Sequence, residues 1–230
     1  MIHFNGIISN CQKIFFKINI LIWICTFFLI SCGNLDRKEI KKNENIIVYM
    51  ENTMFLEIPN LDRNPLFNKE INPDRNQKIN PNENSLLNPA LNTAINPNEN
   101  PSINPMKNEM IHPGIKKEWS YMDNESINPK LTQEINPSYV TKLNPNSAEF
   151  EGKYIFDRHH VVKEFACNIS SEIWLIYNTK FELSKIAVTN KNNGFNLFST
   201  HHEWIGFMIP DENGGFLLFD TKCGWEFYAA

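Results

Sequence analysis

Two pairs of adjacent histidines are the residues of this sequence best suited to chemistry. The pairs are His159-His160 and His201-His202. Imidazole is a common ligand of zinc and copper, and histidine also transfers protons near neutral pH. If the two pairs converge on an axis they could bind a metal, with Asp220 or Cys223 as a further ligand. The alternative is that they are ordinary polar turn residues shared by two related copies of a repeat.

No other catalytic signature accompanies these histidines. The sequence contains no nucleophile elbow, phosphate-binding loop, zinc-protease pattern or evident pair of cleft carboxylates. We therefore expect a non-enzymatic protein without a resident cofactor. If the chain is an enzyme after all, the four histidines are the first candidates for acid and base catalysis.

The N-terminus has the features of an export signal. Lys13 and Lys17 precede an apolar stretch over residues 18–30, which is short for a membrane span but typical of a signal peptide. The stretch ends in Leu-Ile-Ser-Cys at Cys32, which resembles the lipobox of bacterial lipoproteins. The resemblance implies that residues 1–31 are removed and that Cys32 carries a diacylglyceryl group and an acylated N-terminus. An uncleaved signal anchor is the alternative.

Several acyl chains on one residue give stable anchoring, whereas a single chain binds a membrane only reversibly. The lipobox thus implies a lipoprotein of the cell envelope, in the outer membrane if the cell has two membranes, with its facing left open. The formal net charge is only −4, and no run of Lys or Arg could follow a phosphate backbone. Membrane lipid is therefore the expected partner, and nucleic acid is not.

Removal of the signal leaves two free thiols in the mature chain. Cys11 and Cys25 leave with the signal peptide and Cys32 is lipidated, so only Cys167 and Cys223 remain. Cys167 ends a predicted strand and Cys223 lies in a predicted turn, about 15 Å away at 3.3 Å per residue. We predict that they do not form a disulfide.

Residues 64–146 form an octapeptide repeat with the unit Pro-x-x-Asn-x-x-Ile-Asn. Proline recurs every eight residues, with a single break where Tyr121 takes its place; the repeat prolines are Pro65, Pro73, Pro81, Pro89, Pro97, Pro105, Pro113, Pro129, Pro137 and Pro145. Asn followed by Pro favours a type I turn in which the Asn side chain accepts from the N–H two residues on. The residue before each proline is biased toward extended backbone geometry, so a helix across the whole segment is excluded.

One dependable apolar residue per unit is too few to offset the ordering entropy of an isolated repeat. This favours an extended or loosely turned stalk between residues 32–63, a linker, and the C-terminal region. A thin solenoid with an Ile column and Asn ladders remains the alternative.

A second repeat, with a period of 21 residues, occupies residues 147–230. Phe156-Asp157, Tyr177-Asn178, Phe198-Ser199 and Phe219-Asp220 recur in one register, each followed by a short turn and a second apolar strand. Each copy predicts a β-hairpin. A single hairpin is marginal in water, so the four must pack together, and a closed ring removes their free edges.

The region resembles the four-fold β-flower proteins, in which four hairpin petals surround an axis. The resemblance implies an all-β, pseudo-four-fold fold and no particular activity. Hairpin repeats of the WG family are a second resemblance, although their turn glycine occurs here only as Gly224.

Both faces of the predicted strands are apolar. Residues such as Ile155 point to one face and residues such as Phe156 to the other, so one face can fill the ring and the other needs a cover. The cover could be the stalk, a second copy, a lipid or ligand, or a strand from residues 36–62 built on Ile46, Ile47, Val48, Tyr49 and Phe55. The function expected from these features is a membrane-anchored lipoprotein displaying a small β-repeat binding or interaction module on a spacer. A protein or an apolar compound is its expected ligand.

Overall fold

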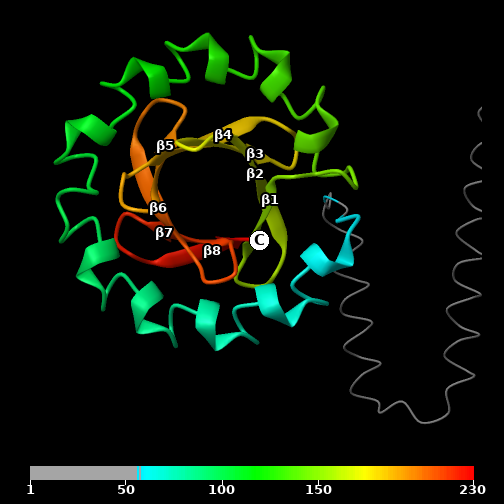
Figure 1. The fold of residues 1–230 in the computed structure, drawn as a ribbon, viewed down its shortest axis with the longest axis vertical. Helices are drawn as coiled ribbons and strands as arrows, with labels where there is room; N and C mark the ends of the chain where they lie inside the picture. The colour runs from blue at the N-terminus through cyan, green and yellow to red at the C-terminus, as the bar shows by residue number, and fades with distance from the viewer. Residues whose placement is uncertain (1–55, 57) are drawn as a thin grey trace, which may run out of the picture. The chain divides into compact units, whose positions relative to one another are not determined.

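Eight β-strands close into an antiparallel barrel at the centre of the computed structural model (Figure 1). The structure describes residue 56 and residues 58–230, within a compact unit that spans Met54–Ala230. The predicted signal peptide, Cys32 and the proposed covering strand at residues 46–55 lie outside the described residues. Within the described part there is no α-helix, and no helix there is long and apolar enough to cross a membrane.

The strands pair in sequence order, and β1 closes the barrel against β8. This confirms the predicted all-β fold and its closure. The strands are β1 (Lys153–Asp157), β2 (Val162–Ser170), β3 (Ile173–Asn178), β4 (Leu183–Thr189), β5 (Phe195–Ser199), β6 (Trp204–Pro210), β7 (Phe216–Asp220) and β8 (Trp225–Ala229).

The turns within the hairpins share one geometry. In each turn the fourth residue has a positive φ, and the polar residue that begins the turn accepts backbone hydrogen bonds. In the first turn His160 has φ 63°, and Asp157 Oδ1 accepts from the N–H groups of His159 at 2.8 Å and Val161 at 3.0 Å. The corresponding positive-φ residues are His160, Phe181, His202 and Cys223. These turns lie at one end of the barrel, here called the turn end; the connections between hairpins define the link end.

The barrel interior is filled by one buried cluster with two apolar residues from each hairpin. Its members are Ile155, Ala166, Ile176, Ala187, Leu197, Met208, Leu218 and Ala229. The odd-numbered strands contribute Ile or Leu, and the even-numbered strands contribute Ala except for Met208 in β6, so short and long side chains share the narrow interior. The prediction that one apolar face fills the ring is confirmed, and this face is the one that contains Ile155.

The outward face of the barrel packs against residues 64–146, which we call the belt. Phe156, Tyr177, Phe198 and Phe219 belong to a second buried cluster that also contains belt residues such as Ile111 and Trp119. Figure 1 shows the belt as a ring of short helical turns around the barrel. Of the covers considered for the second apolar face, the octapeptide segment is observed, together with Leu56 and Ile58 from the segment before it.

The predicted stalk is therefore wrong, because the segment is part of the folded unit. Each octad presents its Ile or Leu and its Pro to the barrel, and every proline of the repeat is buried. The barrel supplies the apolar partner that an isolated octad lacks, so burial offsets the ordering entropy. A thin solenoid is not observed either, because the octads pack on the barrel in a single layer.

Each octad contains two turns where one was predicted. The Asn-Pro turn is confirmed: Phe67 N–H donates to Asn64 O at 3.0 Å, and Leu66 N–H to Asn64 Oδ1 at 3.0 Å. A three-residue 3-10 helix forms the second turn in most octads. These helices are η1 (Leu61–Arg63), η2 (Lys69–Ile71), η3 (Gln77–Ile79), η4 (Ser85–Leu87), η5 (Thr93–Ile95), η6 (Glu109–Ile111), η7 (Lys117–Trp119), η8 (Glu125–Ile127), η9 (Gln133–Ile135) and η10 (Thr141–Leu143).

The second Asn of the octad caps this helix and joins neighbouring octads. Asn84 Oδ1 accepts from Leu86 N–H at 3.1 Å, and Asn84 Nδ2 donates to Lys78 O at 2.6 Å. Asn108 repeats the pattern with Met110 and Ser102. One side chain thus satisfies a helix terminus and a carbonyl of the preceding octad.

The belt runs around the barrel in the sense opposite to the strand order. Along the belt, Asp74 meets the turn between β1 and β2, Asn98 the turn between β7 and β8, and Ser120 the turn between β5 and β6. The start of the belt then meets its end, because the Arg63 guanidinium donates to Phe150 O at 2.6 Å and to Gly152 O. The belt is therefore closed by a direct contact between the residues that flank its two ends.

Candidate functional site

The inner histidine of each pair fastens the belt to a hairpin turn. His160 lies 3.2 Å from Asp74 through Nε2 and 2.7 Å from the Tyr228 hydroxyl through Nδ1. His202 Nε2 lies 3.1 Å from Ser120 Oγ, which itself donates to Asp123 Oδ2 at 2.8 Å. The left-handed backbone at each histidine turns its side chain toward the belt.

The two histidine pairs are therefore not brought together. His159 and His201 are exposed, whereas His160 and His202 contact separate octads. Across residues 56 and 58–230, no group of three or more His, Cys, Asp or Glu side chains could hold a metal ion. The convergence considered for a metal site is not observed among these residues, because His160 and His202 each contact the belt instead.

Burial lowers the pKa of both inner histidines. The pKa of His160 falls through desolvation, although Asp74 opposes the fall, and the pKa of His202 falls for the same reason against Asp123. His112 belongs to the same region, since its pKa is lowered by burial and by His202, and its ring meets Phe198 edge to face at 5.2 Å. These histidines are suited to hold the belt in their neutral form.

The fourth turn uses a thiol in the same place. Cys223 Sγ lies 3.3 Å from Asn96 Oδ1, and Asn98 Nδ2 lies 3.0 Å from Thr221 O. The partners Asn96 and Ser120 are 24 residues, or three octads, apart on the belt. A polar belt residue thus meets the first, third and fourth turns; we call these three contacts the clasps.

At the second turn, a cleft of about 590 Å³ lies between the belt and the barrel. The positive-φ residue of this turn is Phe181, which packs edge to face on Phe165 at 5.4 Å and is only partly buried. The cleft is lined by Tyr121, Met122, Pro129, Lys130 and Asn136 of the belt, by Tyr177, Phe181, Glu182 and Leu183, and by Thr200 and His201 of the third turn.

The cleft coincides with the single break in the octapeptide repeat. Tyr121 occupies the place of the repeat proline and is partly exposed, whereas each repeat proline is buried. Two positions earlier, Trp119 replaces the usual Ile, is buried, and donates from Nε1 to Glu172 Oε2 at 3.1 Å. The position where the repeat lacks its proline thus contributes an aromatic ring to the cleft.

The cleft combines aromatic surface with polar groups at its edge. The Tyr177 hydroxyl donates to Ile135 O at 3.0 Å, and burial raises its pKa, so this group fixes the belt and stays neutral. Lys130, Glu182 and His201 bring charge and hydrogen-bonding capacity to the rim of the cleft. Such a surface suits a ligand with an apolar or aromatic body and polar substituents.

The neighbouring polar groups do not form a nucleophilic site. Ser120 is fully buried and donates its hydroxyl proton to Asp123 rather than to His202. Cys167 is buried, burial raises the pKa of its thiol to about 12, and its Sγ lies 3.4 Å from Leu143 O. Cys223 is likewise a free thiol whose pKa is raised by burial.

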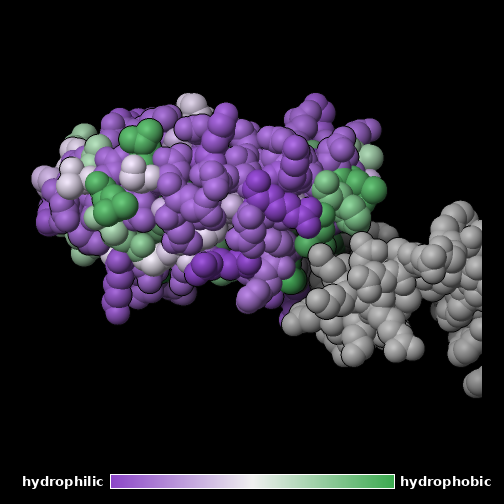
Figure 2. Space-filling view, turned by 90° about the horizontal axis from the view of Figure 1, so that it is seen from below, coloured by the Kyte–Doolittle hydropathy of each residue, from purple (hydrophilic) through white to green (hydrophobic). Residues whose placement is uncertain are grey.

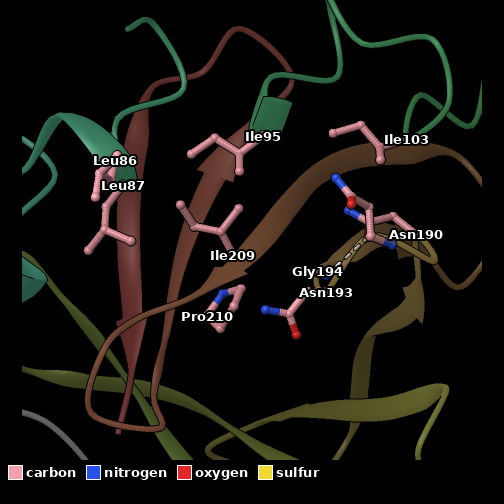
Figure 3. Close-up of a pocket in the computed structure, with 10 residues that line it drawn as sticks. Leu86, Leu87, Ile95, Ile103, Asn190, Asn193, Gly194, Ile209 and Pro210 are labelled. Atoms are coloured by element: carbon pink, nitrogen blue, oxygen red, sulfur yellow. Dashed lines mark hydrogen bonds between the residues drawn. The ribbon is translucent and has the colours of Figure 1, made fainter. Parts of the chain in front are cut away.

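A smaller cavity of about 90 Å³ lies between the belt and the link between β4 and β5 (Figure 3). Leu87, Ile95 and Ile209 form its apolar side and Asn190 and Asn193 its polar side. It has room for a few water molecules at about 30 Å³ each. We regard it as a packing feature of the link end.

Sequence reasoning identified the turn histidines but missed Tyr121 and Phe181. The break at Tyr121 was visible as a missing proline, and Phe181 as the one apolar aromatic at the turn position where its counterparts are histidine or cysteine. Their meeting could not be seen, because it depends on the belt folding back onto the barrel. Comparisons of the chain with protein-family models, with curated proteins and with solved structures found no match.

Proposed function

We propose that this protein is a membrane-anchored lipoprotein of the cell envelope whose belted barrel is a non-enzymatic binding module. The observation that carries the proposal is the coincidence of the cleft with the break in the repeat at Tyr121. The proline position of the repeat, which is otherwise kept from Pro65 to Pro145, departs from its pattern where it borders this cleft. Binding of a protein side chain or of a small apolar or aromatic compound explains this departure; no role for nucleic acid is proposed.

Tyr121→Pro tests the cleft because it restores the residue of the repeat. The Tyr121 N–H forms no hydrogen bond among the described backbone contacts, so proline removes no bond and the fold is retained. Titration of 4-methylphenol, followed by NMR, should shift resonances of Phe181 and Leu183 in the wild type. The shifts should fall at least fivefold in Tyr121→Pro and persist in Leu86→Ser, which changes an exposed residue outside the cleft. Equal shifts in all three proteins would exclude the cleft as the site.

The lipid anchor is the second part of the proposal. It is supported by the Leu-Ile-Ser-Cys sequence behind the apolar stretch that ends at residue 30. Cys32→Ala should abolish labelling by a clickable fatty acid and move the protein out of the membrane fraction. Cys223→Ala serves as the control, since its thiol lies in the folded unit. A labelled, membrane-bound Cys32→Ala protein would refute the anchor.

We also infer that the barrel consists of four related 21-residue hairpins, as in the four-fold β-flower proteins. Support comes from β2, β4, β6 and β8, which begin at residues 162, 183, 204 and 225. The positive-φ residues of the turns follow the same interval, from His160 to Cys223. In each hairpin the register also shifts at the equivalent place, between residues 155 and 156 in the first.

A further inference from the structure

The exposed positions of each octad divide between the two ends of the barrel. The two residues after the proline lie at the turn end: at the first position Asp74 pairs with His160, and at the second position Asp123 accepts from Ser120 Oγ, which contacts His202. The residue five positions after the proline lies at the link end. There, Asn213 Nδ2 donates to Glu70 O at 2.6 Å, and Asn192 Nδ2 donates to Ala94 O at 3.3 Å.

This division places most exposed hydrophobic residues of the belt at the turn end. The second position after the proline carries Phe67, Leu91, Ile115, Leu131 and Tyr139, with exposures between 55% and 70%. The first position adds Leu66, Met106 and Met122. Among the exposed large hydrophobic residues of the belt, the link end has Leu86 and Met110. The exposed apolar side chains are therefore concentrated on one edge of the belt, which we call the rim.

Four of the rim residues are spaced evenly around the barrel. Phe67, Leu91, Ile115 and Tyr139 follow one another at intervals of 24 residues, or three octads. Asn96 and Ser120, which meet successive hairpin turns, are separated by the same interval. Each of the four thus has the same relation to the barrel, so they stand at one level along its axis.

Charged residues separate these apolar side chains from one another. At the same position of the intervening octads lie Arg75, Glu83, Glu99, Lys107 and Asp123. Figure 2, which views the unit from the side, shows hydrophobic residues singly and in small groups on a largely hydrophilic surface. A protein partner requires a contiguous apolar core at its interface. A bilayer accepts separate anchors at one level and leaves the charges between them among the headgroups.

We propose that the rim is a lipid-binding edge through which the turn end rests on the membrane surface. The chain between Cys32 and Leu56 keeps the unit within about 85 Å of a lipid anchor, since each residue spans at most about 3.6 Å. The rim would orient the belted barrel on the membrane surface. This inference rests on the proposed function, in which a lipid anchor holds the protein at a membrane. It also places the cleft at the second turn close to the bilayer.

Vesicle flotation of the chain from residue 33 onward tests the rim without the lipid anchor. This chain contains the complete compact unit, with both buried clusters. The probe is vesicles of phosphatidylethanolamine and phosphatidylglycerol at about three to one, with phosphatidylcholine vesicles in parallel. Leu91→Ser/Ile115→Ser should lower the partition coefficient at least tenfold. Leu86→Ser/Met110→Ser removes two equally exposed apolar residues from the link end and should leave the coefficient unchanged.

Every other outcome overturns the proposal. Absence of flotation by the parent chain, or equal flotation by both double variants, would show that the rim does not bind lipid. A parent chain that is dimeric in light scattering, and monomeric after Leu91→Ser/Ile115→Ser, would assign the rim to a second copy. Thermal unfolding of each variant shows that it is folded. Fatty-acid labelling at Cys32 is measured separately, so a failed anchor is distinguished from a failed rim.

Discussion

At the scale of single residues, the position with positive φ in each hairpin turn decides how the barrel meets the belt. Three of these residues, His160, His202 and Cys223, contact polar belt residues, whereas Phe181 borders the cleft. The backbone conformation is therefore the same in all four turns, and the identity of the side chain decides whether the turn forms a clasp or borders the cleft. The inner histidines, which suggested a metal site in the sequence, instead attach the barrel to the belt.

The clasps make stability depend on pH. Because the pKa values of His112, His160 and His202 are lowered in the fold, the unfolded chain binds more protons near pH 6. The contribution of these histidines to stability is fully present above pH 6.5, which is their pKa in the unfolded chain. It is lost as the pH falls through their lower pKa values in the folded protein. Urea unfolding at pH 7.5 and pH 5.5 should show a lower midpoint at the acidic pH.

His202→Asn should weaken this pH dependence, because asparagine tolerates the left-handed backbone and does not titrate. His159→Asn, at an exposed position in the first turn, is the control and should retain the dependence of the parent protein. An unchanged acid sensitivity in a variant lacking both His160 and His202 would show that other groups, such as the belt carboxylates, are responsible.

At the scale of elements, the octad is held by asparagine rather than by a long helix or a strand ladder. Both amide atoms of Asn108 are used: Oδ1 accepts from Met110 N–H at 3.1 Å, and Nδ2 donates to Ser102 O at 2.7 Å. The three-residue 3-10 helices would not persist alone, because short helices have a costly nucleus. Their caps and their contact with the barrel make them stable.

Asn108→Ala should therefore lower the free energy of unfolding by about 1 kcal/mol, the usual cost of losing a helix cap. Glu109→Ala, at the adjacent exposed residue, should change it by less than about 0.5 kcal/mol. Chemical denaturation of both variants gives the comparison. Equal stability of the two would mean that contact with the barrel, and not the Asn side chains, holds the octads in place.

At the scale of the whole molecule, belt and barrel are two halves of one core. The outward residues Phe156, Tyr177, Phe198 and Phe219 share a buried cluster with Ile111, Trp119 and other belt residues. Neither half can bury its apolar surface without the other. Because of this shared cluster, we do not expect the hairpin region to fold independently of the octapeptide segment.

Separate expression of the two halves should show this dependence. A chain of residues 54–230 should unfold in one cooperative transition, whereas residues 147–230 alone should bind the dye ANS and lack such a transition, because the outer apolar face is uncovered. Mixing residues 147–230 with a fragment of residues 54–146 should restore the transition. If residues 147–230 alone form a stable barrel that does not bind the dye, the barrel does not need the belt in order to fold.

Features that depend on local geometry and periodicity could be predicted from the sequence alone. The 21-residue interval placed the hairpins, the alternation of Ile155 and Phe156 identified two apolar faces, and the Asn-Pro pairs predicted a turn in each octad. These features follow from neighbours in the chain, whose spacing is visible in the sequence. The closed barrel followed as well, because four marginal hairpins have few other ways to satisfy their edges.

The position of the belt and the contacts of the turns could not be predicted from the sequence and are seen in the folded unit. Whether residues 64–146 extend as a stalk or encircle the barrel depends on how two repeats with different periods match. The belt advances by three octads for each hairpin of the barrel, and this ratio cannot be seen from residues that are neighbours in the chain. The cleft between Tyr121 and Phe181 is a product of that match. Long-range packing, which offsets the entropy of an otherwise flexible repeat, is the physical reason that the sequence left this choice open.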